Sequence, residues 1–176
     1  MTFPSLLFAQ EFPRDESIHR IWGNLFGGVS ISNDLKGIGY GASLTYQHDA
    51  TLYSFRFSEA RHIAEPKVVG YSLSSFIQHR SYIPQVSDLG LLYGRSISSY
   101  WFFYTASIGL GAIWGNYHSD TEPDRPFFGI GLPIQAHAAV LLTEELGFGI
   151  LISGNINSKA SYVTAALTFQ MGQLRQ

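Results

Sequence analysis

Three polar residues that could carry out acyl-transfer chemistry stand side by side at positions 118 to 120. His118, Ser119 and Asp120 supply a base, a nucleophile and an orienting acid, the groups that a hydrolytic triad holds within hydrogen-bond reach. Adjacent residues cannot form a triad by themselves, so His62 and Glu59 are further candidates for the same hypothetical catalytic site. Polar residues in connecting segments are usually only solvated, which makes catalysis the less favoured interpretation.

Three other polar residues lie inside segments that otherwise alternate between apolar and small side chains. Arg56, Gln135 and His137 fall on the small side of that alternation. Because a buried polar or charged group is stable only with a partner, we predict a hydrogen-bonded network in the interior. The acid partner of Arg56 is not fixed, since Asp88 and Glu59 both sit near the ends of predicted strands. A proton- or ligand-responsive site is the alternative.

Metal and cofactor chemistry find little support. His62, His79 and His118 are far apart, and no His-x-x-x-His pair is present to suggest a metal site. The glycines near positions 109–111 and 129–131 alternate within strands and form no nucleotide-binding loop. The chain has no cysteine, which excludes disulfides and thiolate chemistry. We therefore predict neither a metal nor a cofactor.

The polar candidates are carried by segments with a period of two. The longest, 100–118 (YWFFYTASIGLGAIWGNYH), is uncharged apart from its final histidine and places large apolar residues on one face and small or polar residues on the other. Successive side chains of a β-strand point to opposite faces, so this pattern predicts a strand. Eight such strands are expected, at residues 18–31, 38–48, 51–60, 88–97, 100–118, 127–142, 146–157 and 161–174.

The chemistry of the two faces indicates which face of each strand points out of the barrel and which points into it. Charged residues make up 14% of the chain, whereas about 25% is usual in soluble domains. The non-apolar faces carry mostly Gly, Ser, Thr, Asn and Gln, which would make a poorly soluble exterior but a good narrow interior. We therefore predict an all-β fold: an eight-stranded antiparallel up-and-down transmembrane β-barrel. A soluble, lipocalin-like ligand-binding barrel is the alternative, and it would require the opposite polarity.

The connections divide into short and long ones. The predicted barrel domain spans residues 18–174, with long loops at about 61–87 and 117–127. Bacterial barrels keep short turns on the periplasmic side and long loops outside, which predicts a periplasmic N-terminal end. Residues 1–9 (MTFPSLLFA) are expected to be the remnant of a signal peptide cleaved after Ala9, followed by a polar lead-in at 10–17.

This pattern resembles the eight-stranded outer-membrane β-barrels of Gram-negative bacteria, the class of OmpA and OmpX, over about residues 18–174. Three segments, LGLLYGRSI, GIGLPIQAHA and GNINSKASY, are similar to uncharacterised barrel proteins of Bacteroidetes-type bacteria. The resemblance implies a bacterial outer-membrane location, with the lipid bilayer and lipopolysaccharide as surroundings. Some barrels of this size modify lipid A with a histidine, a serine and a carboxylate at the outer rim.

These observations favour one function over two others. A barrel of eight strands is just wide enough for side chains to fill it, so an open channel is not expected. A formal charge of -2 and a pI near 6.3 give no basic field for nucleic acid. We expect a monomeric structural or surface-binding protein that contacts partners through its extracellular loops. A lipid A-modifying acyl hydrolase or acyltransferase is the alternative, although residues 137–139 lack the His-x-Ser arrangement of deacylase-type barrels.

Overall fold

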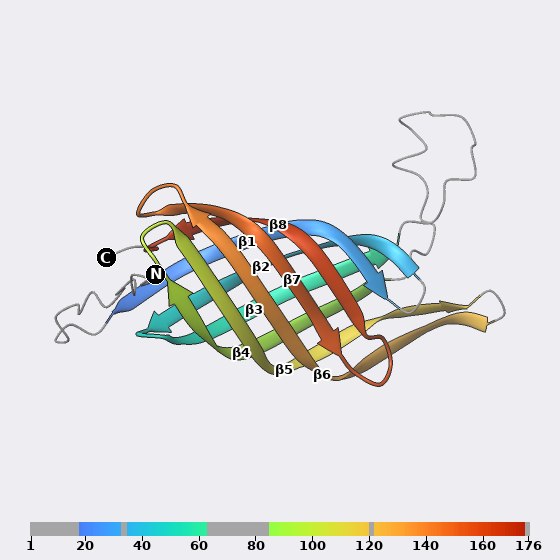
Figure 1. Ribbon diagram of the computed structural model, residues 1–176. Coiled ribbons are helices and arrows are strands. Elements are labelled where there is room, and N and C mark those ends of the chain that lie inside the picture. Colours follow the sequence, from blue (N-terminus) through green and yellow to red (C-terminus); the bar gives the residue numbers. More distant parts are fainter. Residues whose placement is uncertain (1–17, 33–34, 63–84, 120–121, 175–176) are drawn as a thin grey trace, which may run out of the picture.

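The computed structural model describes residues 18–32, 35–62, 85–119 and 122–174, and each strand pairs antiparallel with its chain neighbours. β1 also pairs with β8, which closes the sheet and confirms the predicted barrel (Figure 1). Among the described residues, no helix has the length and apolar character needed to cross a membrane. The strands are β1 (His19–Ser32), β2 (Leu35–His48), β3 (Thr51–His62), β4 (Gln85–Ser98), β5 (Phe102–Ser119), β6 (Glu122–Leu141), β7 (Leu146–Ile156) and β8 (Tyr162–Gly172).

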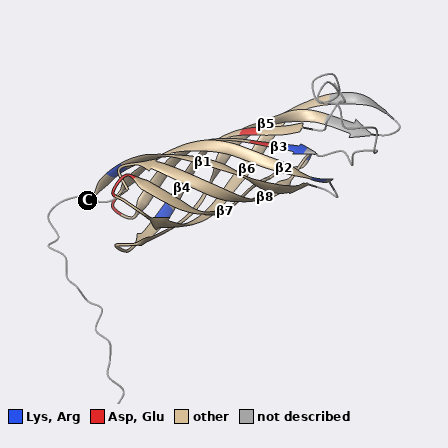
Figure 2. Cartoon of the chain, turned by 90° about the horizontal axis from the view of Figure 1, so that it is seen from above, with Lys and Arg blue, Asp and Glu red and all other residues tan. Residues whose placement is uncertain are grey.

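The apolar face of the strands points outward, as the sequence predicts. On β5, Ile108 and Leu110 are 56% and 65% exposed. In contrast, Gln135 on β6 and Thr168 on β8 are buried inside the barrel. Charged residues mark only a few places along the wall in Figure 2. An exterior of this kind matches a hydrocarbon environment and would be poorly hydrated in water.

Buried side chains fill the interior in successive layers. The layer nearest the end where β1 begins is an apolar plug in which Trp22 and Phe103 pack edge to face, with ring centroids 5.0 Å apart. Leu174 joins this plug because the chain bends at Gly172, whose φ is +141°. The backbone N–H of Leu174 then donates a hydrogen bond to the carbonyl of Glu144. The layers are Trp22, Leu52, Phe103, Leu141 and Leu174, then Phe26, Leu151 and Ala166, then Ala60, Ile113 and Tyr162.

Strands β5 and β6 extend past the rest of the barrel as a two-stranded ribbon (Figure 1). Their pairing continues through Tyr117↔Arg125 to Ser119↔Glu122, with an irregularity in register between Tyr117 and Ser119. The predicted loop at 117–127 is therefore wrong for its described part. The prolines and charges there suggested a loop, but a ribbon in water has two edges, where both are tolerated.

Other strand ends also differ from the predicted ones. β2 begins at Leu35 and β4 at Gln85, each three residues earlier than expected, because alternation is weak where a strand leaves the apolar zone. β8 ends at Gly172, where the backbone turns. Of the predicted loop at 61–87, residues 63–84 lie outside the described residues, as do residues 1–17.

Candidate functional site

The interior polar site is centred on Arg56, which β3 points into the lumen and which is fully buried. One of its terminal nitrogens lies 3.2 Å from each carboxylate oxygen of Asp88 on β4. The guanidinium also donates to the carbonyls of Ile134, at 2.9 Å, and Gly154, at 3.1 Å. The pair is electrically neutral and charge-assisted, the arrangement that a buried arginine requires.

Tyr162 on β8 completes this site from the far side of the lumen. Its hydroxyl donates a hydrogen bond to Asp88 and lies 2.9 Å from the hydroxyl of Ser58. Together with the two carbonyls that Arg56 contacts, the network joins β3, β4, β6, β7 and β8. We name these four side chains, Arg56, Ser58, Asp88 and Tyr162, the interior clamp. The Asp88 carboxylate is held by Arg56 and Tyr162, and only the Nε of Arg56 is left without a partner in the described part of the chain, which suits a structural brace better than a reaction centre.

His137 belongs to a second, separate network. Its Nε2 lies 2.8 Å from the hydroxyl of Thr168, and the side-chain amide of Gln170 donates to its Nδ1 at 3.3 Å. The ring also meets Phe103 edge to face. The structure thus places the predicted residues Arg56, Gln135 and His137 inside the barrel. Arg56 and His137 belong to separate networks, and the buried Oε1 of Gln135 has no hydrogen-bond partner among the described residues.

Sequence reasoning did not single out Tyr162 and left Asp88 as one of two possible acids. Both residues share the lumen-facing parity of their strands. Parity alone could have placed them inside. Whether Asp88 lies at the same height in the barrel as Arg56 depends on the register between β3 and β4. That register cannot be predicted from the sequence because a long segment separates the two strands.

Of the hypothetical catalytic site, only Glu59 has a described side chain. Glu59 lies on the outward face of β3, where it accepts hydrogen bonds from the Tyr40 hydroxyl and the Arg61 guanidinium. Arg61 in turn sits 5.6 Å from the centre of the Tyr40 ring. His62, His118 and Ser119 lie in strands whose side chains there are outside the described set, and Asp120 lies outside the described residues. The described residues include no cluster of three or more potential metal ligands.

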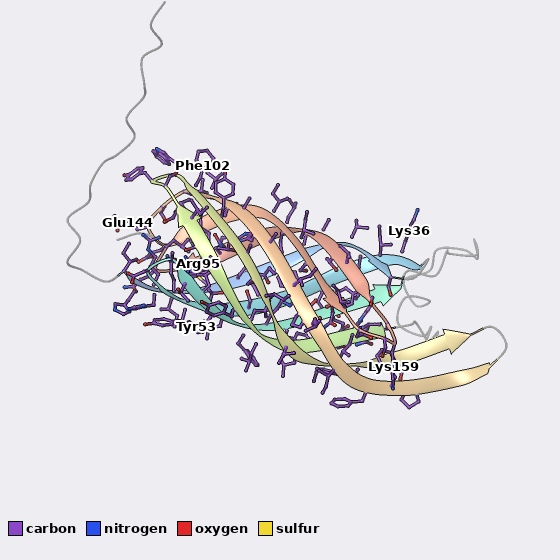
Figure 3. The ribbon with its side chains drawn as sticks, turned by 60° about the horizontal axis from the view of Figure 1, so that its bottom comes forward. Lys36, Tyr53, Arg95, Phe102, Glu144 and Lys159 are labelled. Carbon is purple, nitrogen blue, oxygen red and sulfur yellow. The ribbon has the colours of Figure 1, made fainter. Side chains whose placement is uncertain are left out.

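Cationic residues mark the end of the barrel that carries the ribbon. Lys36 on β2 and Lys159 in the β7–β8 turn lie at this end in Figure 3, and Lys159 donates to the carbonyl of Phe128 at 3.3 Å. Arg61 is exposed near the end of β3. The opposite end carries Arg95 and Glu144 (Figure 3). Arg61 is paired with Glu59, so the described side chains at this rim owe their net positive charge to Lys36 and Lys159, a charge that favours an anionic ligand.

No family model matches this chain, and no curated protein matches it. Solved structures do. Neisserial surface protein A is similar with a TM-score of 0.62 and 9% identity, covering 87% of this chain and 96% of that one. The N-terminal β-barrel domain of Pseudomonas aeruginosa OprF gives 0.58 and 13%, covering 89% and 99%. Ail of Yersinia pestis, in complex with the heparin analogue sucrose octasulfate, gives 0.56 and 10%, covering 89% and 98%. The chain has the fold of these outer-membrane barrels.

Proposed function

We propose that this chain is a bacterial outer-membrane barrel that acts at the cell surface as a structural or binding protein. The observation that carries the proposal is the combination of a filled lumen with a ribbon that projects from one end. A lumen occupied by the apolar plug and the interior clamp has no use as a pore. The projecting β5–β6 ribbon has free edges, which can recruit another chain by strand addition.

Orientation follows from the two ends of the barrel. The connections at residues 49–50, 99–101 and 142–145 are short, and we place this end in the periplasm, as bacterial barrels do. The ribbon then faces the outside of a Gram-negative cell. Residues 1–9 act as a signal-peptide remnant and 10–17 as a lead-in in this proposal. We also propose that the chain is related to the Bacteroidetes-type barrels that its sequence resembles.

Lipopolysaccharide is the proposed surface ligand. Lys36, Arg61 and Lys159 would meet its phosphate groups at the outer rim, where charge-assisted contacts are favourable. The neighbour Ail was solved with a sulfated heparin analogue, so a polyanionic saccharide is a sensible second probe. One barrel closes on itself without a partner strand, which fits a monomer.

The test compares the whole chain with a variant that lacks the ribbon. Residues 117–125 are replaced by Asn-Gly, a two-residue hairpin turn. Folding is checked by heat-modifiable gel mobility in detergent, pore activity by liposome swelling, and binding by titration with lipopolysaccharide. We expect both chains to fold and neither to admit solutes. Because Lys36, Arg61 and Lys159 remain in the trimmed chain, its binding of lipopolysaccharide should persist, whereas recruitment of another chain by strand addition should be lost. Solubility without detergent, or swelling like that of a porin, would contradict the proposal.

The two alternatives receive no comparable support. A lipid A-modifying enzyme needs a free carboxylate beside a histidine and a serine, whereas the partners of Glu59 in the described structure are Tyr40 and Arg61. Loss of a lipid A mass change after His118→Ala or Ser119→Ala would be required to revive it. A soluble lipocalin-like barrel needs a polar exterior, and the wall here is apolar.

A further inference from the structure

A groove of about 570 Å³ runs across the outer wall of the barrel, over β4 to β8. Its floor is low because the cross-strand row Arg95–Ala106–Ala136 contributes two alanines at its centre. The neighbouring row, Tyr93–Ile108–Ile134, stands higher on one side. The lining includes Tyr93, Arg95, Ala106, Ile108, Ala136 and Val163.

The groove is inclined to the barrel ends. Arg95 lies three residues before the end of β4, whereas Val163 lies one residue after β8 begins. Four steps between neighbouring strands cover roughly 19 Å. With the strand tilt usual in membrane barrels, the groove rises roughly 12 Å. One leaflet contributes about half of a hydrocarbon core that is roughly 30 Å thick, so the rise matches a single acyl chain.

Arg95 gives the lower end of the groove a positive charge. Its side chain is exposed on the outward face of β4, which otherwise presents Leu89, Leu91, Tyr93 and Ile97 to lipid. It forms no ion pair within the described part of the chain. A cation on a lipid-facing wall is costly unless it reaches the headgroup layer.

The surrounding aromatics place Arg95 at that layer. Exposed Tyr53 and Tyr93 form a cross-strand pair with ring centroids 5.7 Å apart, and tyrosines of this kind mark the membrane interface. Arg95 lies two residues beyond Tyr93, toward the end that carries Phe102 and Glu144 (Figure 3). The next outward-facing row, Ile97 and Tyr104, is also exposed, so Arg95 lies at the inner edge of the interface, from which its long side chain reaches the phosphates of the proposed periplasmic leaflet.

We propose that the groove is a binding site for one glycerophospholipid of the periplasmic leaflet. The phosphate pairs with Arg95, and one acyl chain lies along Ala106 and Ala136 toward Val163. This inference rests on the proposed placement in a membrane but not on the ribbon or its ligand. A second copy of the chain is the competing occupant, and it would place Arg95 against an apolar wall.

The experiment uses the whole chain in detergent, titrated with phosphatidylglycerol or phosphatidylcholine and examined by native mass spectrometry. Arg95→Gln should weaken the first phosphatidylglycerol about fivefold, the effect of one cation near a lipid surface. Ala106→Leu with Ala136→Leu should fill the groove and weaken both lipids about tenfold. The matched controls, Glu144→Gln in the exposed turn at the same end as Arg95 and Ala42→Leu on the outward face of β2, should not weaken these affinities.

Heat-modifiable mobility shows that each variant is folded, which separates this inference from the proposed membrane placement. If the filled variant does not fold, Arg95→Gln alone decides. Equal phosphatidylglycerol affinities in Arg95→Gln and Glu144→Gln would overturn the proposal. So would unchanged lipid binding together with loss of a dimer in the filled variant, because the groove would then hold a second copy.

Discussion

Asp88 is the residue whose replacement tests the interior clamp most directly. It is fully buried, pairs with Arg56 through both carboxylate oxygens at 3.2 Å and accepts a hydrogen bond from Tyr162. Asp88→Asn keeps the shape but leaves the guanidinium buried without a counter-charge. Because removing one partner of a buried ion pair costs about 3–5 kcal/mol, we expect the free energy of unfolding to fall by that amount.

Replacing both partners separates the effect of charge from that of shape. Arg56→Met combined with Asp88→Leu removes both charges, and exchanges of this kind are often neutral or stabilising by about 1–4 kcal/mol. Here the carbonyls of Ile134 and Gly154 lose their donor, which offsets part of that gain. The double variant should therefore recover most, though not all, of the stability that Asp88→Asn loses.

The assay is urea-dependent folding into lipid vesicles, followed by tryptophan fluorescence and by heat-modifiable gel mobility. Glu144→Gln, in an exposed turn, is the control and should stay within about 0.5 kcal/mol of wild type. If Asp88→Asn unfolds at the same urea concentration as this control, a buried ion pair does not hold Arg56. If the double variant is as unstable as Asp88→Asn, the loss in free energy of unfolding comes from a change of shape and not from the unpaired charge.

Four further substitutions test the wall and the packing by the same urea titration. Leu110→Lys places a charge on an outward position near the middle of β5 and should cost about 2–4 kcal/mol in vesicles; no loss would argue against lipid contact there. Gly109→Ala should cost about 1–3 kcal/mol because the added Cβ would lie 1.8 Å from the Leu91 carbonyl oxygen. Gly129→Ala, whose Cβ meets its first neighbour at 3.7 Å, should be nearly neutral, and equal costs would refute the packing argument. Phe103→Ala opens the apolar plug and should cost about 3–5 kcal/mol, with a smaller loss showing that the plug collapses around the gap.

The two faces of the strands were predictable because their cause is local. Alternation has a period of two whatever the neighbouring strand does, so outward Leu110 and inward Arg56 could be assigned from the sequence alone. The closed order of eight strands followed from the number of segments and from the need to pair every backbone group in lipid. The location of Arg56, Gln135 and His137 depended on the same parity.

Features that depend on register were beyond the sequence. Arg56 meets Asp88 only because Arg56 pairs with Gly90 and Ser58 with Asp88, and a long segment separates the two strands. The groove exists only because Ala106 falls opposite Ala136. The ribbon was missed for another reason: beyond the bilayer no face needs to be apolar, so the alternation that reveals a strand is lost.

A filled interior determines where this chain can act. Opening the lumen would separate the buried charges of the interior clamp and displace the Trp22–Phe103 plug. Separating the ion pair alone costs about 3–5 kcal/mol, against a total stability that is usually about 5–15 kcal/mol. A lipid or saccharide at the surface could not supply that without binding the open form far more tightly than the closed one. Ligands that do not unfold the barrel must therefore bind outside it. Among the described residues, the cationic rim beside the ribbon and the groove that ends at Arg95 have the charge and shape to suit anionic lipids.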